Sequence, residues 1–210
     1  SSFSVVIADL FVPWESQTGY LFTVEHYESI QERLEPGGVF CQWLPLYQLG
    51  TSDFEMIADT LRSVFPHVTL WWGRLDATRP ILALIASNEP LRLDANTITA
   101  RLRSLDEGRG LNDSSLSSFE RLLSLYAGDW QGNVASRLNS DEHPWVEFQS
   151  PLSHRQKTLL QGVVLRDYMD RTWRSLRSTN HQSGTSNDFE LPDRMWQRSV
   201  MFPEPPDLGD

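Results

Sequence analysis

Apolar and polar positions alternate in blocks over the first 87 residues, and these blocks predict strands and helices in turn. The chain starts with an apolar run that ends at Asp9, and a turn with Pro13 follows. A continuous apolar run of this length is typical of a strand that is buried on both faces of a parallel sheet. We therefore expect a strand over 4–9, with further strands at 39–44, 68–72 and 81–86.

Two segments with helical spacing lie between these strands. The first is predicted over about 23–35, with Thr23 as its N-cap and Pro36-Gly37-Gly38 as its end. The second covers about 53–65, has one apolar face, and ends before Pro66. The order is thus strand, helix, strand, helix, strand, strand.

This order predicts an α/β fold, the second half of a doubly wound sheet. The loop 73–79 is too short for a parallel crossover, so we expect the last strand, 81–86, to run antiparallel to the others. Residues 1–90 then form the sheet domain. Residues 91–177 are predicted as a helical extension with a short strand at 145–149 and a helix at about 154–177, and 178–210 as a weakly ordered tail.

The strand at 4–9 needs neighbours on both sides, yet nothing precedes it in this sequence. We therefore expect the chain to be a fragment of a larger protein. An apolar strand with an unpaired edge is adhesive, so the isolated chain is expected to form homo-oligomers through that edge or to cover it with its own tail.

The net charge of the chain limits the kinds of molecule that it is expected to bind. The 210 residues carry a formal charge of -10, which argues against a nucleic-acid-binding surface. The segment 151–177 is an exception, with six basic and two acidic residues and hence a local charge of +4. That segment is either a solvated helix surface or a docking site for an acidic surface or anionic lipid. No run of 18 apolar residues is present.

The single cysteine, Cys41, cannot form an intramolecular disulfide and favours a reducing, cytoplasmic location. Nothing near it in sequence would lower its pKa, so we interpret it as a buried strand residue rather than a nucleophile. The five histidines are scattered, and no Cys/His pair has the spacing of metal ligands, so no metal site is predicted.

Asp9 is the first candidate for chemistry, because ligands of open parallel sheets bind beyond the carboxyl ends of the strands. It acts either as a general base or ligand-binding acid there, or as a cap of the following turn. Gln42 and Trp43 end the neighbouring strand and should lie close to it, while Trp14 and Tyr20 in the first turn could line the same crevice. An amide beside aromatic rings suits recognition of an amine.

Other features favour structural roles. Trp71-Trp72 is interpreted as packing, and the polar loop from Asn139 to Pro144 as a turn, although its acidic residues and His143 leave a metal or catalytic role open. No glycine-rich loop follows a strand, so the sequence contains no signature for binding a nucleoside or phosphate.

With these residues placed, the stretch 4–87 resembles the spermidine synthase family, the aminopropyltransferases. That family has a strand ending in D-x-x-D-P, then a helix, a P-G-G turn and a strand ending in Gln. The matching residues here are Asp9-Leu10-Phe11-Val12-Pro13, Pro36-Gly37-Gly38 and Cys41-Gln42. The run from Trp43 to Gln48 resembles the spermidine synthase-like domains of large bacterial proteins, in which membrane segments precede the domain. Residues 141–148 resemble an acidic D-D-x-P-x-x-E-[FY] stretch of the same group.

The resemblance implies the fold of class I S-adenosylmethionine-dependent methyltransferases, in which strand 81–86 would lie between 39–44 and 68–72. It implies a role in polyamine biosynthesis: transfer of an aminopropyl group from decarboxylated S-adenosylmethionine to a small-molecule amine, with Asp9 as the catalytic acid that deprotonates the amine. Gln42, Trp14, Trp43 and Tyr20 would line the substrate crevice.

Three departures from the family pattern keep alternatives open. The second acid of the motif, a polyamine-binding residue, is Val12 here, and the family's T-x-P-x-Y segment has no counterpart in 73–79. The glycine-rich loop and ribose-binding acid would lie outside this chain, so we expect no S-adenosyl ligand to bind to it alone. The alternatives are a methyltransferase on the same fold and a non-catalytic interaction or regulatory domain. In the intact protein, membrane segments outside this chain would place the domain at the cytoplasmic face of a membrane.

Overall fold

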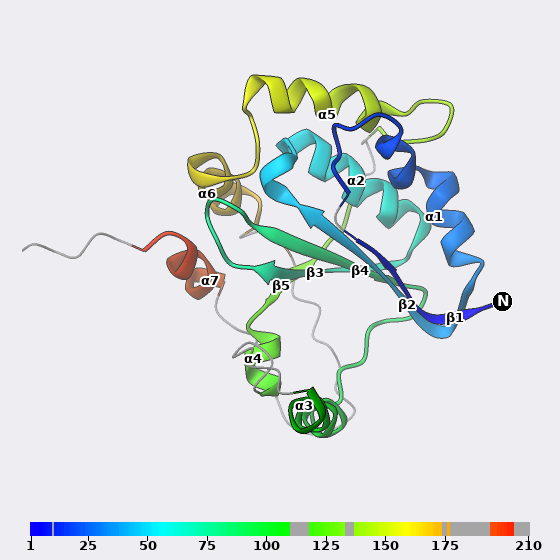
Figure 1. Ribbon diagram of the computed structural model, residues 1–210, viewed down its shortest axis with the longest axis vertical. Helices are drawn as coiled ribbons and strands as arrows, with labels where there is room; N and C mark the ends of the chain where they lie inside the picture. Colours follow the sequence, from blue (N-terminus) through cyan, green and yellow to red (C-terminus); the bar gives the residue numbers. More distant parts are fainter. Residues whose placement is uncertain (10, 110–117, 133–136, 174–175, 177–193, 204–210) are drawn as a thin grey trace, which may run out of the picture.

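A computed structural model of the chain describes residues 1–9, 11–109, 118–132, 137–173, 176 and 194–203. Within them, one sheet lies between helices on both of its faces, so the predicted α/β class is confirmed (Figure 1). Residues 110–117 and most of the predicted tail, 177–193 and 204–210, lie outside the described residues.

The sheet has five strands in the order β1-β2-β4-β3-β5. Their bounds are β1 Phe3–Ala8, β2 Leu34–Pro45, β3 His67–Arg74, β4 Ile81–Ser87 and β5 Tyr126–Asp129. Among the described strands only β1 and β2 pair in parallel, and β4 is antiparallel to both β2 and β3, so β3 runs in the same direction as β2. The expected position of strand 81–86 between 39–44 and 68–72, and its antiparallel direction, are therefore confirmed.

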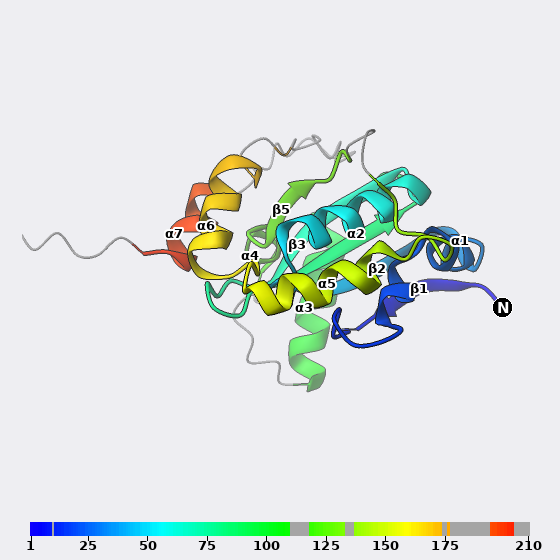
Figure 2. The ribbon, with the colours of Figure 1, turned by 90° about the horizontal axis from the view of Figure 1, so that it is seen from above.

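Helices cover the two faces unequally. The helical segments are η1 Thr18–Phe22, α1 Val24–Gln31, η2 Leu46–Gln48, α2 Thr51–Val64, α3 Ala95–Arg109, α4 Phe119–Leu123, α5 Trp145–Gln156, α6 Gly162–Arg171 and α7 Arg194–Met201. Helices α1, α2 and α5 lie over one face, α3 and α4 over the other (Figures 1 and 2). As predicted, Thr23 caps α1, its Oγ1 accepting the N–H of His26 (3.3 Å).

Alternation along β2 assigns its side chains to two separate cores. Phe40, Gln42 and Leu44 are buried on the side of α1 and α2, where the larger core lies. Cys41 and Trp43 point to the opposite side and pack with residues of α3 and α4. The period of two along a strand is the cause.

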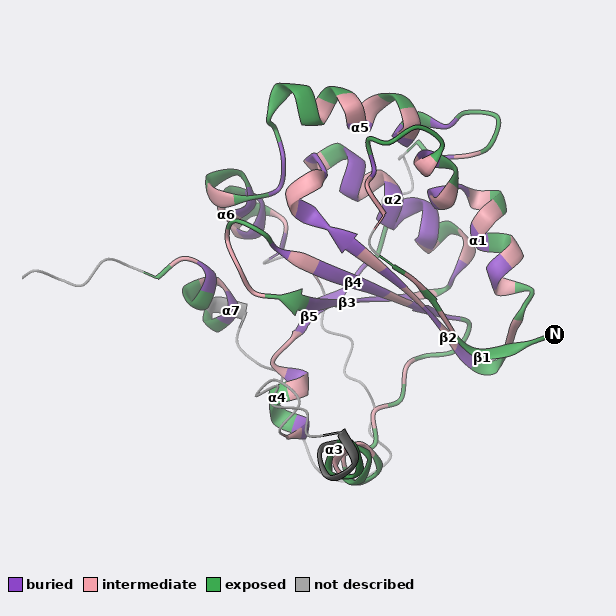
Figure 3. Ribbon diagram, viewed as in Figure 1, coloured by how far each residue is buried: buried purple, intermediate pink, exposed green. Residues whose placement is uncertain are grey.

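Strand β1 is at the edge of the sheet and pairs only with β2 among the described residues. Its side chains Phe3, Val5 and Ile7 are exposed, whereas Val6 and Ala8 pack against the larger core (Figure 3). The expectation that both faces of this strand are buried is therefore wrong for the described chain, while the expected unpaired edge is observed.

The strand predicted at 145–149 is wrong, because these residues begin the helix α5. Val146 and Ser150, four residues apart, face the interior, and Trp145 and Phe148 face outward. The continuous helix predicted at 154–177 is also wrong. Lys157 has a positive φ of 56° and ends α5, and α6 starts only at Gly162.

Two further predictions need correction. The first helix ends at Gln31 and not at Pro36-Gly37-Gly38, which instead forms an irregularity where the pairing with β1 shifts register. Gly37 has a φ of +74°, which favours glycine. Part of the predicted tail is ordered as α7, whose buried Gln197 accepts the indole N–H of Trp72 (3.0 Å).

Candidate functional site at the carboxyl ends of the parallel strands

The candidate site lies at the end of β1, beside β2, which does not end at Gln42 and Trp43 as predicted but continues to Pro45. Ala8 of β1 is in register with Gln42 of β2, and Asp9 follows directly. Asp9 is exposed, so its carboxylate is accessible to a solute. Asp9 thus follows the end of β1, one residue beyond the level of Gln42, which lies within β2.

Gln42 is fully buried and only partly hydrogen-bonded. Its Nε2 donates to the carbonyl of its neighbour Trp43 (3.2 Å), and its Oε1 has no hydrogen-bond partner among the described residues. A buried amide oxygen without a donor costs about 1–3 kcal/mol. This oxygen can accept an N–H group, although the structure buries it; the backbone of Gln42 lies one residue from the level of Asp9.

Trp43 does not lie on the same face of β2 as Gln42. Its ring packs over Gly73, where an added Cβ would come within 2.3 Å of the ring. The neighbours of Trp43 belong to the smaller core under α3 and α4. The structure therefore puts the backbone of Asp9 one residue beyond the level of Gln42, and it turns the Trp43 side chain to the face of β2 opposite Gln42.

Trp14 and Tyr20 lie in the segment that leads from β1 to α1, and both are exposed. The Trp14 ring stacks on the imidazole of His154 in α5, with 4.5 Å between the ring centroids. This segment follows the end of β1 in the chain, and the placement of the two aromatic residues along the crevice stays a prediction. Within the described residues, neither ring forms a stacking contact or a hydrogen bond with Gln42.

Glu147 and Asn139 hold this segment in place. The sequence pattern predicts Glu147 in a strand and Asn139 in a turn. The carboxylate of Glu147 accepts the backbone N–H of Gln17 (2.7 Å) and of Gly19 (2.9 Å). The buried Asn139 donates from Nδ2 to the Gly19 carbonyl (2.9 Å) and accepts the N–H of Val146 at Oδ1 (3.0 Å). The acidic stretch 139–147 thus holds the segment after β1 against α5.

Replacing Asn139 by Ala is expected to lower the free energy of unfolding by about 2–4 kcal/mol, because it leaves two buried backbone groups without partners. Urea unfolding followed by tryptophan fluorescence measures this difference. Asn88→Ala is the matched control, since Asn88 is exposed, and it should change stability by no more than about 0.5 kcal/mol. Equal effects of the two substitutions would contradict the positioning role of Asn139.

The remaining polar groups near the strands have structural environments. Burial raises the pKa of Cys41 to about 11, so its side chain is a protonated thiol at neutral pH. This agrees with the interpretation that Cys41 is not a nucleophile. Burial also raises the pKa of Asp53, whose Oδ2 accepts the N–H of Gly50 (2.9 Å) at the start of α2. The described residues contain no cluster of three His, Cys, Asp or Glu side chains suited to a metal ion.

Comparisons with known proteins do not assign the site: the chain matches no family model and no curated protein. Among the described helices, none has the length and apolar composition needed to span a membrane.

Proposed function

We propose that this chain forms the acceptor side of a spermidine synthase-like transferase, with Asp9 as the general base. The observation that carries the proposal is the position of Asp9, exposed at the end of β1 and next to the level of the buried, half-satisfied amide of Gln42. The order β1-β2-β4-β3, with β4 antiparallel, supports the fold implied by the resemblance.

The chemistry required of this chain concerns the acceptor amine. An amine is protonated near neutral pH and must lose a proton before its nitrogen lone pair can attack. The Asp9 carboxylate would accept that proton. Gln42 Oε1 is buried in the structure, so it would accept a second N–H and orient the nitrogen only after the side chains that cover it move. Decarboxylated S-adenosylmethionine, when bound, would supply the aminopropyl group.

The residues of this chain do not fit a complete donor site. No glycine-rich loop follows β1, β2 or β3, and such a loop is what cradles a nucleoside at the end of a strand. The proposal therefore assigns no donor-binding residue to this chain, and it derives no step through the donor. The expectation that the chain alone binds no S-adenosyl ligand remains part of the proposal.

The acceptor is proposed to carry a single ammonium group. Val12 stands where the resembled family has its second acid. Glu147 approaches the same segment, but each of its oxygens already accepts a backbone N–H. A second ammonium group of a diamine would therefore lack a carboxylate partner from either residue, and a monoamine fits better.

A second candidate function is a non-catalytic interaction domain that keeps this fold. The placement of Trp43 and Trp14 favours it, because one ring faces the opposite core and the other stacks on His154. Without these rings beside Gln42, the aromatic wall expected of an amine site is incomplete.

Titration with butylamine, followed by ¹H–¹⁵N NMR of the full chain, tests the proposed acceptor site. We expect saturable shifts at Asp9 and Gln42, with butanol of the same length producing none. Asp9→Asn should abolish the shifts, and Glu15→Gln, an exposed acid of the same segment, should preserve them. Equal responses to amine and alcohol, or an unchanged response in the Asp9→Asn chain, would contradict the proposal and favour the non-catalytic domain.

A further inference from the structure

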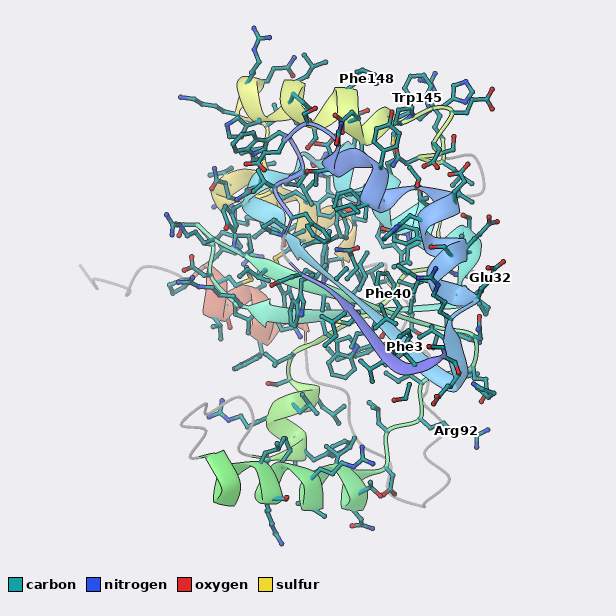
Figure 4. The ribbon with its side chains drawn as sticks, turned by 45° about the vertical axis from the view of Figure 1, so that its right-hand side comes forward. Phe3, Glu32, Phe40, Arg92, Trp145 and Phe148 are labelled. Carbon is teal, nitrogen blue, oxygen red and sulfur yellow. The ribbon has the colours of Figure 1, made fainter. Side chains whose placement is uncertain are left out.

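The outer side of α5 carries an exposed apolar stripe. Trp145, Phe148 and Leu152 are 37%, 67% and 51% exposed, and Phe148 is the most exposed large apolar side chain in the described part of the chain. Their spacing of three and four residues puts them on one side of the helix. Figure 4 shows Trp145 and Phe148 at the outer margin of the molecule, on the side of α5 away from the sheet.

This stripe differs from a solvated helix surface, which normally carries charged side chains. Between Glu142 and Arg155 the only acidic or basic residue apart from histidines is Glu147, and both of its oxygens accept backbone N–H groups. Charged side chains lie instead at the two ends of α5. Asp141 and Glu142 precede it, and Arg155 and Lys157 end it; all four are exposed.

We propose that α5 packs antiparallel against α5 of a second copy of this chain. The stripe is nearly symmetric about Phe148, so an antiparallel pair would place Trp145 of each copy against Leu152 of the other. The same arrangement would bring the acidic start of each helix to the basic end of its partner. A two-fold interface of this kind needs one self-complementary patch, and α5 provides it in shape and in charge.

The distribution of charge around the stripe favours a second copy of the chain over an anionic membrane as the partner of α5. Arg155 and Lys157 follow one end of the stripe, and at its other end Arg137 lies over the Trp145 ring, 5.1 Å from the ring centroid, beside the acidic pair Asp141 and Glu142, which anionic lipid would repel. Three apolar side chains bury less than the roughly 800 Å² per partner of a standard interface, so the dimer is expected to be weak and concentration-dependent.

Sedimentation velocity of the full chain over a range of concentrations tests the proposal. We expect a monomer–dimer equilibrium that Phe148→Glu shifts to monomer. Val163→Glu, an equally accessible apolar position on α6 with 61% exposure, should leave it unchanged. Ile7→Lys addresses the rival interface at the edge of β1 and should also leave the dimer intact. A chain that is monomeric throughout, or a dimer lost in Ile7→Lys and kept in Phe148→Glu, would overturn the proposal; the second result would support pairing through β1.

Charge reversal tests the antiparallel orientation separately. Glu142→Arg and Arg155→Glu are each expected to raise the dissociation constant about 3- to 30-fold, since each creates two like-charge encounters in a two-fold pair. The double variant should restore the wild-type constant, which a purely local effect on α5 would not do. A double variant as weak as its parents would overturn the antiparallel arrangement. None of these outcomes depends on the proposed transferase function.

Discussion

Replacing Asp9 by Asn is expected to lower the rate of aminopropyl transfer by about 10²–10⁴-fold in the intact protein, the usual contribution of a general base. Asparagine keeps the size of the side chain but cannot take a proton from the acceptor ammonium. Donor affinity should be nearly unchanged, because the proposal assigns no donor-binding residue to this chain. Turnover with saturating amine and calorimetric titration with donor measure the two quantities.

Glu15→Gln is the control for this experiment, because it neutralises another exposed carboxylate of the same segment without touching the strand end. It should leave turnover within about two-fold of the wild type, as expected of an exposed side chain with no part in the reaction. Full activity of the Asp9→Asn protein would remove the base assignment. Tight donor binding by the 210-residue chain alone would show that the cofactor site has been misplaced.

Truncating Phe54 to Ala is expected to cost about 3–5 kcal/mol of unfolding free energy, the largest stability effect predicted for a single side chain here. Phe54 is fully buried in α2, and its ring contacts those of Trp130, Tyr168 and Trp173, at centroid distances of 5.5, 6.1 and 5.9 Å. These rings join α2 to the chain beyond β5 and α6, so the cavity would lie between elements far apart in sequence.

Urea unfolding measures this cost, with Phe3→Ala as the matched control. Phe3 is the same residue type in an exposed position on β1, so its loss should cost less than about 1 kcal/mol. Similar urea midpoints for the two variants would show that the contacts of Phe54 between α2 and α6 do not contribute to the main core as described.

The antiparallel direction of the last strand could be predicted because it follows from local signals. The helical segments at 23–35 and 53–65 are long enough for crossovers, and the loop 73–79 is too short for one. The hairpin therefore had to be antiparallel. Its place in the sheet came from the resemblance, and the pairing of β4 with both β2 and β3 agrees with it.

Short apolar segments explain most of the errors. Trp145, Val146 and Phe148 form an apolar group too short for periodicity to distinguish helix from strand. Because Phe148 is exposed, the apolar pattern did not mark the buried side of the helix. Strand β5 has four residues, including Gly128, and becomes a strand only by pairing with β3.

The candidate site was predictable in part. The parallel pairing of β1 and β2, which puts Asp9 one residue beyond the level of Gln42, was expected. The separation of Gln42 from Trp43 follows from the same period of two that places side chains on alternate faces, and the prediction overlooked it. The roles of Glu147 and Asn139 depend on contacts with residues 128 and 120 positions away, which no local pattern indicates.

The most direct test of the central proposal is product analysis with the intact protein. The protein would be incubated with decarboxylated S-adenosylmethionine and a panel of monoamines and diamines, and separately with S-adenosylmethionine, and the products identified by mass spectrometry. We predict an aminopropylated monoamine that the Asp9→Asn protein does not form. A methylated product from S-adenosylmethionine alone would point to a methyltransferase, and no product from either donor would point to a non-catalytic domain; each of these results would contradict the proposed function.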